Sequence, residues 1–488
     1  MDIKIYPARL EGVVKAIPSK SQAHRALICA ALADAPTRIE CEGGSEDISA
    51  TAACLAALGA GIERDSGGYT VIPACRGERG AEYCIPCEDA GNGEATDGVV
   101  PSLPCGESGS TFRFLLPIVG ALGLEASFML KGRLPQRPLS PLYEELINHG
   151  CALSPQGTVP FSAAGQLAPG SYVLDGGVSS QFVSGLLFAL PLLEGDSELR
   201  LTGCVESFPY IEMTVAMQEV FGVKTTFDGA TFTILGRQTY RSPGNINVEG
   251  DWSNASFWLS AGAIGTGAVS CSGLDPQSRQ GDRAIIDILS RFGAKVEWAG
   301  SRLFACSSHG TEIVTTGEGR NSINSSVVTV TGGNLRGIDI DAKDIPDLVP
   351  ILAVVATAAD GTTTIKNASR LRTKESDRLA AIVEVLRTLG ANITETEDGL
   401  IITSTSVTPT GVTPTSVTPT SGNTSTSSTL TGGTVSSHGD HRIAMSAAIA
   451  ATLCTEPVTI QGAEAVNKSY PRFFDDLWLL GGKLAPNP

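Results

Sequence analysis

The sequence predicts an α/β protein made of two similar domains, each built from three βα-type units. Three observations support this prediction. A helix–Gly–strand signature recurs six times, almost wholly apolar helices alternate with these signatures, and three such pairs lie on each side of residue 248. At 488 residues, the chain is also too long for one ordinary hydrophobic core.

Each signature contains a helical apolar pattern that ends in Gly and is followed by strand-like residues. Glycine ends a helix readily because it adopts the left-handed conformation without a steric penalty. We therefore expect six helix ends, each leading directly into a strand. The segments are LAALGAGI (55–62), LINHGCAL (146–153), EVFGVKT (219–225), LSRFGAKV (289–296), LRTLGANI (386–393) and LWLLGGKL (477–484).

A second set of predicted helices is apolar on nearly every face. Such helices are buried on all sides, so we expect each unit to pair one buried helix with one amphipathic outer helix. The buried set, in chain order, is SQAHRALICAALA (21–33), GSTFRFLLPIVGALG (109–123), SSQFVSGLLFALPLL (179–193), SNASFWLSAGAI (253–264), IPDLVPILAVVATAA (345–359) and DHRIAMSAAIAATLC (440–454).

The chain is expected to cross between the two domains twice, near residues 15–19 and 242–250. Both crossings contain Pro or Gly, in AIPSK and RSPGNINVEG. We expect residues 1–17 to supply the first strand of one domain, whose remainder is residues 248–488. The other domain comprises residues 18–247.

Two stretches are predicted to be inserts outside the units. Residues 403–437 contain VTPT three times and little that can form a core, which is typical of a disordered surface loop. Residues 75–104 are rich in Gly, Cys, Asp and Glu and are predicted to be a second loose insert. Its cysteines at 75, 84, 87 and 105 fit no well-defined zinc finger, so a surface insert is favoured over a zinc site.

Composition excludes several classes of function. The formal net charge of −16 argues against nucleic acid as the main partner, because a phosphate backbone needs a basic surface. No run of 18 apolar residues predicts a membrane span, and MDIKIYPARL does not resemble a signal peptide. The 12 cysteines lie mostly in apolar stretches and are expected to be buried thiols. We therefore expect a cytoplasmic protein that binds neither membrane nor nucleic acid.

Polar residues open every predicted buried helix, and capping of backbone N–H groups explains about half of them. Ser19 and Gln22 even match a capping box. Capping does not explain Arg25, Arg113 and Arg442, because a cation near a helix start opposes the helix dipole. An anion between the helix end and the arginine would satisfy both charges. If several helix starts converge, they form an anion pocket inside an acidic protein.

Ten motifs occur in the order found in a known family. They are KSQAHRALICAALA, GESGSTFRFLLP, GRLPQRPLSPL, VSSQF, ESFPYIEMT, EGDWSNASFWL, DIPDLVPILAV, LRTKESDRL, GDHRIAM and NKSYPRFF. With them the chain resembles the 5-enolpyruvylshikimate-3-phosphate (EPSP) synthases over nearly its whole length. The resemblance implies a two-domain inside-out α/β barrel, in which each domain has three βαβαββ units around buried helices.

The resemblance also implies the reaction. Members transfer the enolpyruvyl group of phosphoenolpyruvate to the 5-hydroxyl of shikimate 3-phosphate by addition and elimination, releasing phosphate. No metal or organic cofactor is implied, and a monomer that closes on its substrates is expected. The substrate-binding residues implied by the motifs are Lys20, Ser21, Arg25, Gly109, Arg137, Ser179, Ser180, Gln181, Ser207, Tyr210, Asp347, Lys374, Arg378, Arg442 and Lys468, with Arg113 as a supporting residue.

Four residues are implied to be catalytic: Asp347, Glu375, Lys20 and His441. Asp347 would accept the proton of the 5-hydroxyl and Glu375 would serve the methylene carbon, whereas His441 would assist proton transfer or only orient its neighbours. The catalytic and binding assignments also have ordinary structural alternatives. Asp347 resembles a first-turn helix acid, and Lys374 and Arg378 have the spacing of a solvated helix face.

The sequence departs from the family pattern at Glu107, where many members carry Asn, and at Arg370, where some carry an Asn that touches the ring. The ring contact is therefore not transferred to Arg370. Two alternative functions remain. One is the related UDP-N-acetylglucosamine enolpyruvyl transferase, whose usual loop Cys is missing from KGRLPQRPL. The other is a non-catalytic anion-binding homologue, which would gain nothing from Asp347 and Glu375 beside its ligand.

Overall fold

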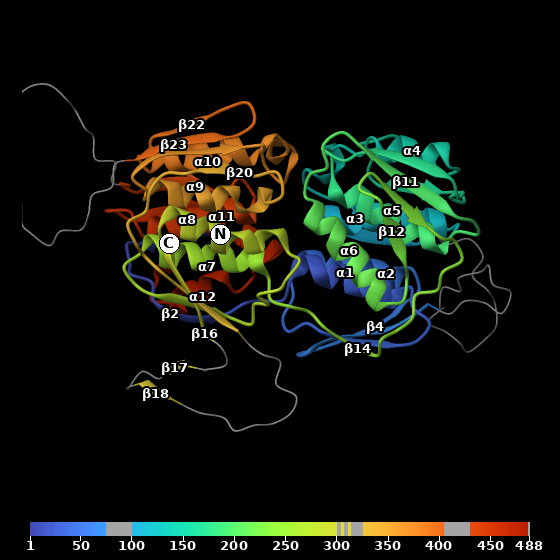
Figure 1. The fold of residues 1–488 in the computed structure, drawn as a ribbon, viewed down its shortest axis with the longest axis horizontal. Helices are drawn as coiled ribbons and strands as arrows, with labels where there is room; N and C mark the ends of the chain where they lie inside the picture. Colours follow the sequence, from blue (N-terminus) through green and yellow to red (C-terminus); the bar gives the residue numbers. More distant parts are fainter. Residues whose placement is uncertain (75–99, 300–303, 307–310, 314–325, 405–429, 487–488) are drawn as a thin grey trace, which may run out of the picture.

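The computed structural model describes residues 1–74, 100–299, 304–306, 311–313, 326–404 and 430–486. The chain forms two lobes that lie side by side (Figure 1). The first lobe comprises the elements from α1 to β14, and the second comprises β1, β2 and everything from α7 onwards. Both chain ends belong to the second lobe, because β1 lies between β25 and β26 in one sheet.

The first lobe contains six α-helices and three four-stranded sheets among the described residues. Its elements are α1 (Lys20–Ala31), β3 (Thr37–Glu40), α2 (Glu46–Ala57), β4 (Gly61–Asp65), β5 (Gly68–Ile72), β6 (Ser102–Gly106), α3 (Gly109–Ala121), β7 (Ala126–Leu130), η1 (Leu134–Gln136), α4 (Leu142–Asn148), β8 (Ala152–Leu153), β9 (Phe161–Ala164), β10 (Ser171–Asp175), α5 (Ser180–Ala189), η2 (Leu190–Leu192), β11 (Ser197–Thr202), α6 (Phe208–Val220), β12 (Thr225–Phe227), β13 (Thr231–Ile234) and β14 (Asn245–Asn247).

The second lobe repeats this plan. Its elements are β1 (Asp2–Tyr6), β2 (Gly12–Lys15), α7 (Trp252–Ile264), β15 (Val269–Ser272), η3 (Gly281–Ala284), α8 (Ile285–Phe292), β16 (Lys295–Ala299), β17 (Phe304–Cys306), β18 (Thr311–Ile313), β19 (Val327–Thr331), β20 (Asp339–Asp341), η4 (Pro346–Leu348), α9 (Val349–Thr357), β21 (Gly361–Lys366), η5 (Ser369–Thr373), α10 (Arg378–Thr388), β22 (Ile393–Glu395), β23 (Leu400–Ser404), β24 (Gly433–Ser436), α11 (His441–Ala451), β25 (Val458–Gln461), η6 (Ala463–Lys468), α12 (Phe473–Leu479) and β26 (Lys483–Pro486).

All six four-stranded sheets share one topology. The orders are β14-β3-β5-β4, β6-β7-β9-β8, β10-β11-β13-β12, β16-β19-β15-β2, β20-β21-β23-β22 and β24-β25-β1-β26. In each sheet a parallel pair of strands continues into two antiparallel pairings, as β10, β11, β13 and β12 do. A helix connects the parallel strands in four of the sheets, whereas the parallel pairs β14–β3 and β2–β15 are separated in the chain by most or all of the first lobe. The six units expected from the repeated signature are therefore confirmed, with the βαβαββ order that the resemblance implied.

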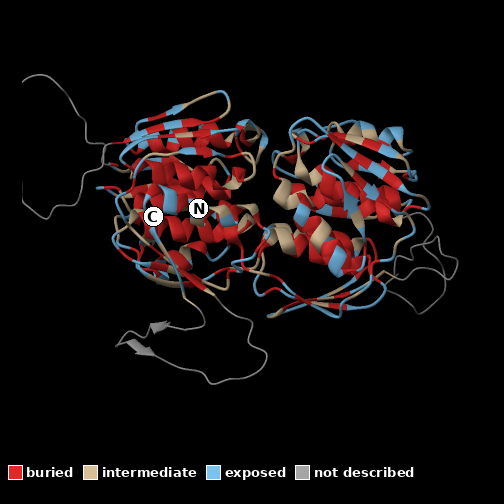
Figure 2. Cartoon of the chain, in the orientation of Figure 1, coloured by how far each residue is buried: buried red, intermediate tan, exposed pale blue. Residues whose placement is uncertain are grey.

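The inner helices of each unit are buried almost completely. Every residue of α9 and α11 is buried, and so are twelve of the thirteen residues of α7. Figure 2 shows these helices in red at the centre of each lobe. Burial on all faces explains why their sequences have no polar stripe.

Two separate hydrophobic cores follow the division into lobes. One core draws on residues from 23 to 248, and the other on residues 3–16 together with residues from 252 to 480. We propose residues 1–17, 18–247 and 248–488 as the domain segments, because the two cores and the six sheets divide along these lines.

The two chain crossings lie against each other. Pro18 and Gly250 form an isolated antiparallel bridge. The Ser19 N–H donates to the Glu249 carbonyl, and the Asp251 N–H donates to the Ile17 carbonyl, both at 2.8 Å. The covalent connection between the lobes is thus a short two-stranded ribbon.

The predicted glycine ends of the six outer helices are confirmed, whereas the predicted capping box is confirmed only in part. The six signature glycines all have positive φ, from 77° at Gly222 to 109° at Gly293. The capping box at Ser19 is only half formed. Ser19 Oγ accepts from the Gln22 N–H at 3.4 Å, but the Gln22 side chain accepts from the Glu249 N–H instead of returning to the cap.

Both inserts are shorter than predicted, because strands occupy the ends of the predicted stretches. Strand β6 begins at Ser102, inside the 75–104 stretch, and places buried Cys105 in the core 3.8 Å from Cys54 Sγ. Strands β23 and β24 occupy both ends of the 403–437 stretch, because β24 pairs with β25 in a parallel ladder. The remainder, residues 75–99 with three of the clustered cysteines and residues 405–429, lies outside the described residues. No helix in the described part of the chain is long and apolar enough to cross a bilayer.

Candidate active site

A deep cavity lies where the N-terminal ends of the inner helices of both lobes meet. Sixteen of the residues predicted for the site line it: Lys20, Ser21, Arg25, Gly109, Arg137, Ser179, Ser180, Gln181, Ser207, Tyr210, Asp347, Lys374, Glu375, Arg378, His441 and Arg442. Their binding roles remain predictions. The structure brings together residues that are up to 422 positions apart in the chain, from Lys20 to Arg442.

The cavity is strongly cationic although the protein is acidic. Eight arginines and lysines line it, against three carboxylates, which gives an excess of five positive charges. The cations are Lys20, Arg25, Arg113, Arg137, Arg370, Lys374, Arg378 and Arg442, and the carboxylates are Asp47, Asp347 and Glu375. Buried charge of one sign in a low-dielectric cavity attracts ligands of the opposite sign. The arrangement therefore favours one or more polyanions.

Two arginines of the first lobe meet over a glycine. A Cβ atom at position 109 would lie 2.8 Å from an Nη1 atom of both Arg113 and Arg137. Any side chain there would displace the guanidinium groups, so Gly109 lets both approach the start of α3. The Nε atoms of Arg113 and Arg137 are buried without a partner among the described residues.

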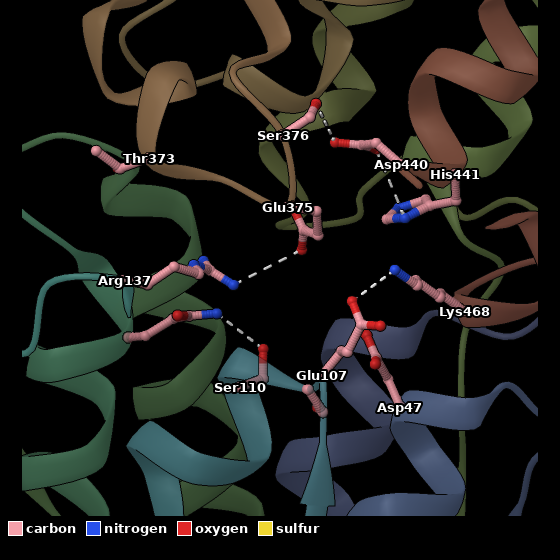
Figure 3. A network of polar contacts seen from close by, with 12 residues as sticks. Asp47, Glu107, Ser110, Arg137, Thr373, Glu375, Ser376, Asp440, His441 and Lys468 are labelled. Carbon is pink, nitrogen blue, oxygen red and sulfur yellow. Dashed lines mark hydrogen bonds and ion pairs between the residues drawn. The ribbon is translucent and has the colours of Figure 1, made fainter. Parts of the chain in front are cut away.

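Arg378 is the centre of a buried ion-pair network in the second lobe. Its Nη1 donates to Asp347 and its Nη2 to Glu375, each at 2.8 Å. Its Nε donates to Asp440 at 2.8 Å, and the side chain is only 2% exposed. Arg442 adds a bond from Nη2 to Asp347 at 2.9 Å. The two acid–base candidates, Asp347 and Glu375, are thus fixed in position by arginines. Figure 3 shows Glu375 facing Arg137.

These contacts set the protonation states of the two carboxyl groups. Burial by itself would raise the pKa of Asp347, but Arg442, Lys374 and Arg378 outweigh it, so the pKa lies below its ordinary value. Burial opposes a low pKa at Glu375 too, yet Arg378 and Arg137 hold that pKa well below its usual range. Both groups are therefore carboxylates while the cavity contains no anion.

His441 is neutral in this arrangement. Burial lowers its pKa, and the nearby charge of Lys20 lowers it further. Neither ring nitrogen has a hydrogen-bond partner among the described residues. The ring faces Asp440 at 3.8 Å (Figure 3).

Lys20 begins α1 and is paired with a residue that the sequence did not single out. Its Nζ lies 2.8 Å from Asp47 at the start of α2, and both side chains are less than a fifth exposed. Burial alone would lower the pKa of Lys20, but the Asp47 carboxylate raises it overall. Asp47 resembles an ordinary acid in the first turn of a helix after the Ser45 cap. Nothing local in the sequence distinguishes it from an acid that only stabilises the helix dipole.

A row of hydroxyl and amide groups lines the first-lobe wall of the cavity. Ser179 caps α5, and its Oγ accepts from the Gln181 N–H at 3.3 Å. The Gln181 side chain donates to Ser110 at 2.9 Å and accepts from Arg113 at 2.8 Å, which ties α5 to α3. Ser180 and Ser207 lie on the same wall.

Arg25 and Tyr210 hold the helices of the first lobe together at the cavity. Arg25 donates through Nε to Thr214 at 2.8 Å and through Nη2 to the Tyr210 carbonyl at 2.7 Å. The Tyr210 hydroxyl donates to Asp282 at 3.2 Å, across to the second lobe. Asp282 is a buried carboxyl whose pKa is raised to about 7, mainly by burial and also by Asp347.

The alternative that Lys374 and Arg378 share a solvated helix face is wrong. Helix α10 begins at Arg378, whereas Lys374 directly follows the 3₁₀ turn η5. Both side chains line the cavity. Burial lowers the pKa of Lys374 to about 8, and the positive charge of Arg370 contributes to this shift.

Lys468 is the one predicted site residue outside the cavity lining. Its Nζ pairs with Glu107 of the first lobe at 2.6 Å and donates to the Gly439 carbonyl at 2.8 Å (Figure 3). The acid that departs from the family pattern at position 107 therefore neutralises a lysine that was predicted to bind substrate.

The cavity also contains residues that the sequence did not predict for the site. They are Asp47, Ser110, Phe114, Pro138, Val178, Phe182, Pro346, Arg370 and Thr373. Most lie next to predicted residues in the chain, so proximity in a motif was the only signal that could have found them. Arg370, to which the ring contact of the family's Asn was not transferred, also lines the cavity.

The chain is similar to known proteins over nearly its whole length. The family model described as EPSP synthase (3-phosphoshikimate 1-carboxyvinyltransferase) matches residues 5–477. The 3-phosphoshikimate 1-carboxyvinyltransferase of Clostridium kluyveri is 40% identical over 99% of this chain and 98% of its own length. The protein of the same name from Clostridioides difficile is 38% identical over 99% and 98% of the two chains.

Solved structures agree in fold. An EPSP synthase from Acinetobacter baumannii superposes with a TM-score of 0.74 at 24% identity, over 99% of this chain and 100% of that one. The enolpyruvyl transferase NikO from Streptomyces tendae gives a TM-score of 0.69 at 18% identity, over 99% and 98%. At these identities the likeness concerns the fold alone.

Proposed function

The chain belongs to the EPSP synthase family, and we propose that it transfers the enolpyruvyl group of phosphoenolpyruvate to the 5-hydroxyl of shikimate 3-phosphate. The observation that carries the proposal is the cavity, where an excess of five positive charges surrounds two fixed carboxylates. Each substrate contributes a phosphate and a carboxylate, so together they match the unbalanced positive charge. A purely anion-binding cavity would not need Asp347 and Glu375.

Shikimate 3-phosphate is assigned to the wall formed by the first lobe together with Lys374. Ser179, Ser180 and Ser207 offer hydroxyl groups, and the start of α5 offers a helix N-terminus. Gln181 and Tyr210 lie beside them for contact with the ring.

Phosphoenolpyruvate is assigned to the space between Lys20, Arg137 and Arg442. The guanidinium groups of Arg137 and Arg442 each retain an unpartnered buried Nε among the described contacts. Planar guanidinium groups suit carboxylate and phosphate oxygens because two N–H bonds can form in parallel. Arg378 supports this subsite chiefly by holding the carboxylates, since three acids occupy its donors.

Asp347 is the proposed acceptor of the hydroxyl proton. It is ionised beside Arg442, Lys374 and Arg378, as a general base must be. The 5-oxygen then bonds to C2 of phosphoenolpyruvate while the methylene carbon gains a proton, which forms a tetrahedral ketal. Loss of phosphate and of one methyl proton restores the double bond in the product.

Glu375 is the proposed proton carrier at the methylene carbon, which requires it to be protonated first. Its low pKa depends on Arg378 and Arg137. A bound trianion would partly neutralise these cations and raise that pKa, so substrate binding itself prepares the acid. His441, neutral and next to Lys20, is proposed to orient the groups around it.

Lys468 can reach phosphoenolpyruvate only after it leaves Glu107. We therefore propose that this lysine binds the substrate by exchanging an internal carboxylate for an external anion. Lys468 thus has a negatively charged partner both before and after the substrate binds.

The test is release of inorganic phosphate when the purified protein is mixed with shikimate 3-phosphate and phosphoenolpyruvate. UDP-N-acetylglucosamine serves as a parallel acceptor. We expect release with the shikimate acceptor alone. Release with the sugar nucleotide alone, or with neither acceptor, would contradict the proposal.

A further inference from the structure

Arg370 reaches across the interface between the lobes. It lies in η5 of the second lobe, and its side chain is 11% exposed. Its Nη2 hydrogen-bonds to Ser207 Oγ in the first lobe and donates to the Lys343 carbonyl at 2.8 Å. Its Nε lies 3.0 Å from a carboxylate oxygen of Glu206.

The contact with Ser207 fixes a residue in an unusual conformation. Ser207 has a φ of 54°, the left-handed region that residues with a Cβ rarely occupy. It directly precedes α6 but makes no side-chain cap for that helix. Its hydroxyl is therefore held at the cavity wall by Arg370 and not turned toward the backbone of α6.

Arg370 and Lys374 are neighbouring cations in the cavity lining, and besides burial the charge of Arg370 is close enough to lower the pKa of Lys374. The Asp347 carboxylate near both of them already pairs with Arg378 and Arg442. No hydrogen bond in the described part of the chain uses Nη1 of Arg370 or Nζ of Lys374. Two cavity-lining cations that each retain a nitrogen without a hydrogen bond in the described part of the chain indicate the place of an anionic group of a ligand.

We propose that Arg370 binds the phosphate of shikimate 3-phosphate through its free Nη1, and that it positions Ser207 for the same phosphate. This inference rests on the proposed function and deepens it. The assignment gives the ring phosphate three hydroxyl groups and two cations: Ser179, Ser180, Ser207, Lys374 and Arg370.

A phosphate suits this corner of the cavity better than a carboxylate. A dianion with three terminal oxygens can accept bonds from hydroxyl groups on one side and from two cations on the other. A monoanionic carboxylate has two oxygens and would leave part of this donor set unsatisfied. Glu206 lies 3.0 Å from Nε of Arg370, so the phosphate would meet the other end of the guanidinium group, where Nη1 makes no hydrogen bond in the described part of the chain.

The experiment compares binding of shikimate 3-phosphate with binding of shikimate, which has the same ring and no phosphate. Calorimetric titrations use the wild-type chain, Arg370→Gln, Arg370→Lys and the control Arg372→Gln. Arg372 lies in the same 3₁₀ turn but pairs with Glu395 and Asp377, away from the cavity. Thermal melts establish that each variant is folded.

We expect Arg370→Gln to weaken binding of shikimate 3-phosphate by about 10- to 100-fold, the usual effect of losing a charge-assisted hydrogen bond. Binding of shikimate and the KM for phosphoenolpyruvate should change by less than about threefold. Arg370→Lys should be intermediate, because it keeps the charge and loses the planar fork. The control should match the wild type.

Three results would overturn the assignment. One is an Arg370→Gln variant that binds shikimate 3-phosphate within about threefold of the wild type, and another is an equal loss for both ligands, which would indicate a structural role only. The third applies if Arg370→Gln does not fold: an Arg370→Lys variant that binds shikimate 3-phosphate as tightly as the wild type would also overturn the assignment. A wild-type chain that neither binds shikimate 3-phosphate nor releases phosphate would instead contradict the proposed function itself.

Discussion

At the scale of the residue, Asp347 shows how a carboxylate is kept ionised inside a cavity. It is bonded to Arg378 at 2.8 Å and to Arg442 at 2.9 Å, and these charges outweigh the cost of its burial. The same contacts aim both carboxylate oxygens at protein donors. Removal of its charge should therefore affect proton transfer more than the affinity for anions.

We predict that Asp347→Asn lowers kcat by about 10²- to 10⁴-fold, the usual contribution of a general base. The affinity for shikimate 3-phosphate should stay within about threefold, because the neighbouring cations lose a competing carboxylate. Single-turnover kinetics and calorimetry measure the two quantities, with the exposed Asp339→Asn as control. Near-normal turnover would remove Asp347 from the mechanism.

The lowered pKa of Lys374 predicts that binding of shikimate 3-phosphate depends on pH. Burial lowers its pKa to about 8, and a bound phosphate would raise that pKa again. The complex then holds more protons than the free protein above pH 8, so affinity falls as pH rises through this range.

We expect the Kd for shikimate 3-phosphate to be nearly constant from pH 7 to 8 and to rise by up to about tenfold per pH unit above it. Lys374→Arg should abolish this rise, because arginine stays protonated throughout. The same slope in both proteins would assign the titration to another group.

At the scale of the element, the loop between β6 and α3 connects the lobes through one ion pair. Glu107 follows β6, and its carboxylate holds Lys468, the last residue of η6 in the second lobe. The side chain of Glu107 is 39% exposed and that of Lys468 is 16% exposed. A ligand anion can reach this lysine only by competing with the loop.

We predict that Glu107→Gln lowers the KM for phosphoenolpyruvate by about three- to tenfold, because Lys468 no longer has an internal anion to release. Glu464→Gln is the control, since Glu464 lies in the same 3₁₀ turn and pairs with the exposed N-terminal amine. Steady-state kinetics at low and high salt measure the change. A higher KM in Glu107→Gln would mean that the glutamate positions the lysine for substrate.

The buried helices were the most predictable elements. Their uniformly apolar sequences, the caps Ser19, Ser108, Ser179, Asp251 and Asp440, and the glycine ends are local signals that survive folding. The edges of the inserts were less predictable. Short strands such as β24 are stabilised by their partner strand β25, which lies in another part of the chain.

At the scale of the whole molecule, opposite charges and hydrogen bonds connect the lobes around a cationic cavity. Glu206 pairs with Arg370 at 3.0 Å, and the Phe208 N–H donates to Asp344 at 3.2 Å. Arg137 faces Glu375 at 3.9 Å (Figure 3). Apart from such contacts, the lobes are joined covalently by the two crossings near Pro18 and Gly250 alone.

We predict that shikimate 3-phosphate compacts the protein in solution. Unbalanced cations on facing walls repel one another, and an anion between them removes that repulsion. Small-angle X-ray scattering should show a smaller radius of gyration on saturation, with shikimate as the control ligand. An unchanged scattering curve would count against closure of the lobes.

The sequence by itself determined the six units, their inner and outer helices, the two crossings and the family, because these depend on periodicity, capping and ordered motifs that are local in the chain. Only the tertiary structure decided which charges meet. Asp47 pairs with Lys20, Glu107 with Lys468, and Arg370 with Glu206. Coulomb energies depend on distance in space and on burial, and neither quantity exists until the two lobes bring the helix ends together.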